Sequence, residues 1–112
     1  FSMLGKSQEE RRNREYEVSL VNALKNSYEG IEKIKITEPY YSEKPGSWSC
    51  DVEIKFIDEK NLKYGINHHL SYKTNYGGRQ ETNEDWQYLE THKGKTLKSV
   101  KITYSDYEQG EQ

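Results

Sequence analysis

Residues 47–56 have the sequence SWSCDVEIKF, and the pattern of this stretch is the clearest indication of the fold. Its apolar residues occupy every second position: Trp48, Cys50, Val52, Ile54 and Phe56. Successive side chains of a β-strand point to opposite faces of the sheet, so this alternation predicts a strand with one buried and one solvated face. A sheet with one apolar face needs another element to cover it.

A helix upstream of this strand is suited to that role. Its large apolar residues recur every four positions and form one stripe: Tyr16, Leu20, Leu24 and Tyr28. Ser7 and Glu10 have the spacing of a capping box, which marks the start of a helix. Gly30 suits the end of the helix, where a residue tolerant of positive φ is preferred. The pattern predicts a helix over residues 8–29 that packs on the sheet.

Alternating apolar residues predict three further strands, at residues 34–41, 62–73 and 100–104. The second of these follows a short turn at residues 58–61, and one of its faces carries Leu62, Tyr64, Ile66, His68, Leu70 and Tyr72. The stretch over residues 84–92 has two interpretations, a short helix or another strand. The spacing of Trp86 and Leu89, one helical turn apart, favours the helix.

These elements predict an α+β fold, with an N-terminal helix packed on a curved antiparallel sheet of about four strands. The chain of 112 residues suits one domain over residues 1–112. Within it, residues 1–6 are expected to be disordered or close to a membrane anchor, and residues 106–112 to form a polar tail. No stretch approaches the roughly 20 apolar residues of a membrane span.

The composition excludes some functions. The net charge of −2 provides no positive field to capture nucleic acid, so no nucleic-acid partner is expected. The single cysteine, Cys50, excludes an intramolecular disulfide. Aliphatic residues are scarce, but ten tyrosines and two tryptophans add apolar surface for a core or an interface.

Residues 65–72, GINHHLSY, contain two adjacent histidines. Neighbours on a strand point to opposite faces, so His68 and His69 cannot readily bind one ion. His92 is the only other histidine, and metal sites generally need three or four ligands, so no metal is expected. His68 falls on the apolar face, where burial should lower its pKa. His69 falls on the polar face, as a surface residue or a binding contact.

Other reactive residues have simpler explanations. Cys50 and His68 share the predicted inner face, but no motif around Cys50 supports a nucleophile and base. Asp51 and Glu53 project together from the polar face. Cross-strand pairing explains these carboxylates better than acid–base chemistry, and their expected partners are Lys55, Lys63 and Lys73. We expect no catalytic residues and no cofactor.

Aromatic residues at predicted loops and strand ends indicate where a partner binds. Tyrosine and tryptophan are enriched at binding hot spots. The predicted partner-binding residues are Tyr40, Tyr41, His69, Tyr76 and Trp86.

The order of a helix followed by IEKIKITEPYY, SWSCDVEIKFID, LKYGINHHLSYK and LKSVKITYSDY resembles the cystatin-like arrangement. This arrangement recurs in small surface proteins and lipoproteins of Gram-positive bacteria and in NTF2-like domains. The resemblance implies an extracytoplasmic position at the surface of such a bacterium. Cystatin protease inhibitors carry a Gln-x-Val-x-Gly hairpin. Residues 80–84, QETNE, depart from that pattern, so protease inhibition is not implied.

We therefore expect a non-catalytic module that binds a protein partner, either extracytoplasmic and tethered to the membrane in the native protein or, as the alternative, cytoplasmic. One alternative is an immunity-type protein that masks a bacterial toxin. Another is an NTF2-like enzyme or small-molecule binder, whose pocket would be lined by Tyr64, His68 and Asp51. A filled core with an open polar sheet face favours the binding module, whereas an enclosed cavity containing His68 favours the enzyme.

Overall fold

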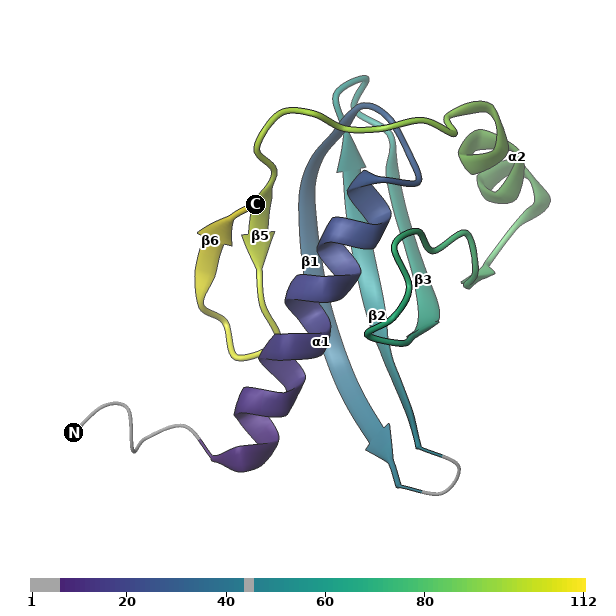
Figure 1. Cartoon of the computed structure of the whole chain (residues 1–112). Coiled ribbons are helices and arrows are strands. Elements are labelled where there is room, and N and C mark those ends of the chain that lie inside the picture. Colours follow the sequence, from purple (N-terminus) through teal and green to yellow (C-terminus); the bar gives the residue numbers. More distant parts are fainter. Residues whose placement is uncertain (1–6, 44–45) are drawn as a thin grey trace.

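The computed structural model describes residues 7–43 and 46–112 and confirms the α+β class (Figure 1). Helix α1 lies across one face of the sheet, and the shorter helix α2 lies near one end of it. The elements in chain order are α1 (Gln8–Lys25), β1 (Ile31–Ser42), β2 (Ser47–Phe56), β3 (Asn61–His68), β4 (Arg79–Gln80), α2 (Asn83–Thr91), β5 (Lys101–Thr103) and β6 (Gln109–Glu111). The expectations for residues 1–6 lie outside the described residues.

Helix α1 begins as predicted and ends earlier. The Ser7 hydroxyl accepts a hydrogen bond from the Glu10 backbone N–H at 3.1 Å, and the Glu10 carboxylate accepts one from the Ser7 N–H at 3.0 Å. The predicted end at residue 29 was wrong, because the helix stops at Lys25. Beyond it, Tyr28 forms a β-bridge with Lys93. A long-range backbone pairing thus replaces the last helical turn.

The sheet has more strands than predicted among the described residues. Six strands follow the order β4-β3-β2-β1-β5-β6. β1, β2 and β3 are antiparallel neighbours as expected, but β5 runs parallel to β1. Parallel strands need a long crossover connection. The chain between β1 and β5 provides it, because this segment contains β2, β3, β4 and α2. β4 and β6 have two and three residues, too few to show alternation.

Strand β3 ends at His68, so the prediction of a strand to residue 73 was wrong. A turn follows, in which the Tyr72 N–H donates to the His69 carbonyl at 3.0 Å. The His69 ring nitrogen Nδ1 accepts the Ser71 backbone N–H at 3.1 Å. Such local side-chain bonds compete with the sheet ladder. Leu70 and Tyr72, predicted to face inward, are therefore exposed.

The last third of the chain contains helix α2 and strand β6. Residues 83–91 form helix α2, which confirms the helical alternative, and the Thr82 hydroxyl caps it by accepting the Asp85 N–H at 3.1 Å. Leu89 is buried, whereas Trp86 is exposed. The expected polar tail instead contains β6, which pairs with β5 and forms one edge of the sheet.

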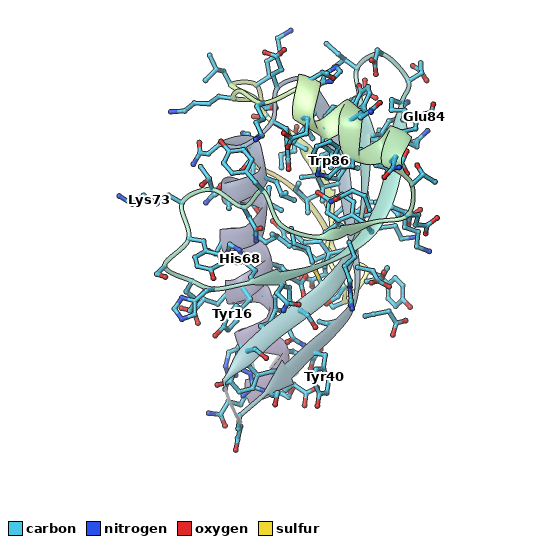
Figure 2. The ribbon with its side chains drawn as sticks, turned by 90° about the vertical axis from the view of Figure 1, so that its right-hand side faces the viewer. Tyr16, Tyr40, His68, Lys73, Glu84 and Trp86 are labelled. Carbon is cyan, nitrogen blue, oxygen red and sulfur yellow. The ribbon has the colours of Figure 1, made fainter. Side chains whose placement is uncertain are left out.

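The core lies between α1 and the face of the sheet that packs on it, here called the inner face. Leu20 and Leu24 are fully buried there, as the stripe predicted. Tyr16 stacks on Trp48 with 5.3 Å between ring centroids, and Trp48 donates to Asn13 at 3.1 Å. The opposite face, here called the outer face, is covered by no helix among the described residues (Figure 2).

Neither helix among the described residues has the length and apolar character needed to cross a membrane.

Candidate functional site

The five predicted partner-binding residues do not form one surface. Tyr40 and Trp86 are 65% and 52% exposed, but they lie at opposite ends of the molecule (Figure 2). Tyr41 packs against the core beneath the Arg12 guanidinium, which lies 4.1 Å from its ring centroid. Tyr76 contacts the ring of Tyr28 edge-on at 5.7 Å. His69 is exposed in the turn after β3.

His68 occupies a buried polar cluster with Ser19 and Asn75. Its side chain is 3% exposed on the inner face, which confirms the face predicted for His68, whereas His69 is exposed in the turn after β3 and lies on no strand face. The Ser19 hydroxyl lies 2.9 Å from His68 Nε2. Asn75 Nδ2 lies 3.0 Å from His68 Nδ1. The cluster joins α1, the end of β3 and the following loop.

The order of these groups resembles a catalytic triad, but its hydrogen bonds run the other way. Asn75 Nδ2 also donates to the Asn67 carbonyl at 2.8 Å, and Asn75 Oδ1 accepts the Gly77 N–H at 3.0 Å. These bonds fix the amide orientation, so Nδ2 donates to His68 Nδ1 and the ring proton lies on Nε2. Nε2 then donates to Ser19 and cannot take its proton, as a general base must.

Electrostatics supports a neutral His68. Burial, assisted by the nearby His69, lowers the pKa of His68 to about 4. Burial likewise raises the pKa of the Cys50 thiol well above its usual range, which suppresses the reactive thiolate. No hydrogen bond joins Cys50 to His68, although both lie on the inner face. These groups therefore pack and connect elements of the core.

The residues proposed for an enclosed pocket lie on two faces. Tyr64 and His68 are buried on the inner face. Asp51 lies on the outer face, where its Oδ1 would be 3.4 Å from a Cβ added at Gly65. These residues therefore do not line one cavity. Within residues 7–43 and 46–112, no three His, Cys, Asp or Glu side chains are grouped to hold a metal ion.

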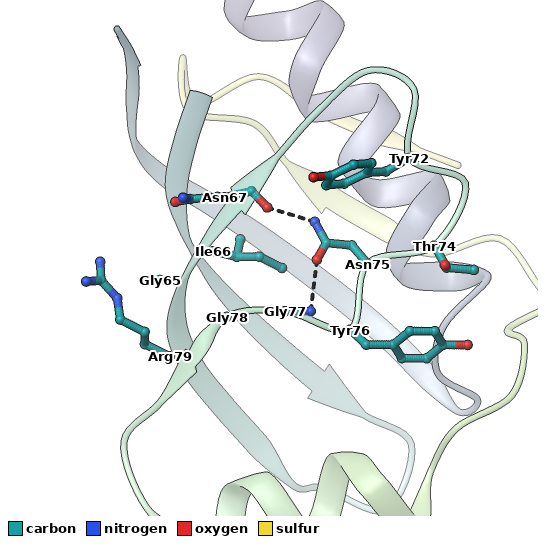
Figure 3. A pocket seen from close by; sticks show the side chains of 10 residues that line it. All are labelled: Gly65, Ile66, Asn67, Tyr72, Thr74, Asn75, Tyr76, Gly77, Gly78 and Arg79. Atoms are coloured by element: carbon teal, nitrogen blue, oxygen red, sulfur yellow. Dashed lines mark hydrogen bonds between the residues drawn. The ribbon is translucent and has the colours of Figure 1, made fainter. Parts of the chain in front are cut away.

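A groove of about 610 Å³ opens between β3 and the loop before β4 (Figure 3). Tyr72 and Tyr76 form one side of it, and Asn75 lies between them and β3. At Gly78 the backbone has φ +109°, and an added Cβ would lie 2.5 Å from the Tyr64 ring, so only glycine fits there. The groove thus depends on close backbone packing against β3.

The outer face carries lysines and carboxylates on neighbouring strands. Glu53 lies between Lys35 of β1 and Lys63 of β3 in the strand register, but no ion pair within 4.0 Å joins Asp51 or Glu53 to a lysine among the described residues. Lys73 lies in the loop after β3, so its expected place beside them was wrong. Lys55 instead pairs with Glu32 at 3.2 Å.

A second groove, of about 750 Å³, runs over β6, β5, β1 and β2 on the outer face. Lys33, Lys35 and Lys101 line it, and all three are exposed. The proximity of these lysines could not be predicted from the sequence, because it depends on the parallel pairing of β1 with β5. The sequence does show that Lys33 and Lys35 flank a buried position of the same strand, which places both lysine side chains on the solvated face.

Comparison with known proteins found no matching family model, no matching curated protein and no matching solved structure.

Proposed function

We propose that this protein is a non-catalytic binding module that recognises a protein partner through the outer face of its sheet. The observation that carries the proposal is the contrast between the two faces. The inner face is closed by α1 over a buried core, whereas the outer face is polar and uncovered among the described residues. An open sheet face of this kind offers a broad, rigid surface on which partner contacts can form.

The hydrogen bonds of the inner face further support a binding role. The buried histidine is held neutral and its proton lies toward Ser19, so the cluster stabilises the fold without activating a nucleophile. We further propose the cystatin-like arrangement for the chain. The helix followed by the antiparallel strands β1, β2 and β3 supports it, whereas the parallel β5 departs from an entirely antiparallel sheet.

Site-specific photo-crosslinking in the native host tests this function. A photoreactive amino acid at Thr37 or Thr103 would present its reactive group on the outer face, and the same residue at Ser99 provides the exposed control. We expect one protein to be captured reproducibly from both outer-face positions and not from the control. Capture at the control position alone, or no protein adduct at the outer face, would contradict the proposal.

A further inference from the structure

Three lysines lie side by side across neighbouring strands of the outer face. Lys33 of β1 has Lys55 of β2 as its partner in the antiparallel register and Lys101 of β5 as its partner in the parallel register. We call Lys101, Lys33 and Lys55 the lysine row. Adjacent strands are about 4.8 Å apart, and like charges directly opposite each other destabilise a sheet. The row therefore costs stability in the free protein.

Among the described residues, ion pairs within 4.0 Å form at only one end of this row. Lys55 Nζ pairs with Glu32 at 3.2 Å and with Glu59 at 3.5 Å. Among the described residues, no carboxylate lies within 4.0 Å of the Lys33 or Lys101 ammonium group. The same holds for Lys35, although Glu53 faces it in the register, and Glu111 of β6 faces Lys101 in the same way. Three exposed ammonium groups thus remain available to an external anion.

The local charge of the groove is opposite to that of the whole chain. Its charged lining residues are Lys33, Lys35, Lys55, Lys101, Glu53 and Glu111. Lysines therefore outnumber carboxylates in the groove, whereas the chain carries a net charge of −2. This contrast favours a ligand that places negative charge on the groove, and it disfavours a long polyanion, which the rest of the chain would repel.

We propose that the outer-face groove binds an acidic, extended segment of a partner protein. The inference rests on the proposed function and specifies the chemistry of the partner. Lys33 and Lys35 are alternate residues of one strand, so their side chains emerge about 6.6 Å apart. An extended peptide with carboxylates at alternate positions has the same repeat. Its acidic side chains can meet both lysines, with Lys101 beside them.

The test measures binding of a model peptide to the full 112-residue chain by NMR. The probe is an acetylated and amidated octapeptide of alternating glutamate and alanine, and the control peptide replaces each glutamate with glutamine. We expect the glutamate peptide to shift backbone amides around Lys33, Lys35 and Lys101. Added salt should weaken this binding, because exposed charge pairs are screened.

Two double variants provide a matched comparison. Lys33→Gln with Lys101→Gln removes two charges from the groove, and Lys95→Gln with Lys98→Gln removes two charges from exposed positions outside it. The groove variant should bind about tenfold more weakly, and the control variant within about twofold of the parent chain. The groove variant should also be at least as stable as the parent, because like-charge repulsion is relieved.

Several outcomes would overturn the inference. These are no shift with the glutamate peptide, equal binding of the glutamine peptide, or equal loss of binding in both variants. Tighter binding of a thymidine octanucleotide would indicate nucleic acid, and self-association through the same lysines would indicate a second copy of this chain. If crosslinking captures a protein at the outer face but the peptide does not bind, the proposed acidic character of the partner segment is wrong. The proposed function then still stands. Peptide binding without any crosslinked protein would contradict the proposal that the natural partner is a protein.

Discussion

Asn75 donates a hydrogen bond from Nδ2 to Nδ1 of His68 across 3.0 Å, and this bond determines which ring nitrogen of His68 carries the proton. The same amide nitrogen donates to the Asn67 carbonyl. The Asn75 backbone N–H donates to the Ser27 hydroxyl at 2.8 Å. One buried side chain and its backbone thus hold the loop after β3 against both the sheet and the end of α1.

His68 should make the protein less stable in acid. Its folded pKa, about 4, lies below the ordinary histidine value of 6.5, so the unfolded chain binds a proton first as the pH falls. The stability contribution of neutral His68 is complete above about pH 6.5 and is lost between there and pH 4. The loss should be roughly 2–3 kcal/mol. Chemical denaturation across this range should show a shallower pH slope for His68→Gln than for the parent chain, and equal slopes would contradict the prediction.

Asn75→Ala should loosen the loop that carries Tyr72 and Tyr76. The substitution leaves the Asn67 carbonyl and the His68 ring without their donor, and an unsatisfied buried polar group costs about 1–3 kcal/mol. Hydrogen exchange should accelerate over residues 72–78 more than in α1. Thr74→Ala, at an exposed neighbouring position, serves as the control. Equal exchange in both variants would show that Asn75 does not hold the loop.

Leu20→Ala and Leu24→Ala should each lower the free energy of unfolding by about 2–5 kcal/mol, the range for truncation of a buried leucine. Both side chains are fully buried between α1 and the sheet. Leu97→Ala, at an exposed leucine, should change stability by less than about 0.5 kcal/mol. Changes that small at both core positions would refute the docking of α1.

Glu17 should produce the opposite pH dependence to His68. Burial raises its pKa, although the Ser105 N–H and hydroxyl donate to the carboxylate at 3.0 and 2.5 Å. The folded chain therefore holds this proton to a higher pH than the unfolded chain. Stability falls as the pH rises from about 4.5 through the raised pKa. Glu17→Gln should gain stability relative to the parent over that interval, as measured by chemical denaturation, and an equal pH dependence in both chains would contradict the prediction.

Local periodicity in the sequence was enough to predict the longer elements. The alternation of residues 47–56 identified β2 and its buried face, and the four-residue spacing of the stripe identified α1. The alternation of residues 62–68 placed His68 on the inner face. These results follow because side-chain direction along a strand or helix is fixed by the backbone, which neighbouring residues specify.

Features that depend on contacts between distant segments could not be predicted in this way. The bridge between Tyr28 and Lys93 accompanies the early end of α1, and the turn held by His69 ends β3 before Tyr72. The lysine row requires β5 to lie parallel to β1. Strand register is set by packing and chain connection across the fold rather than by local pattern. Strand β5 has three residues, too few for its periodicity to indicate which strand it pairs with. The candidate binding groove therefore could not be predicted from the sequence.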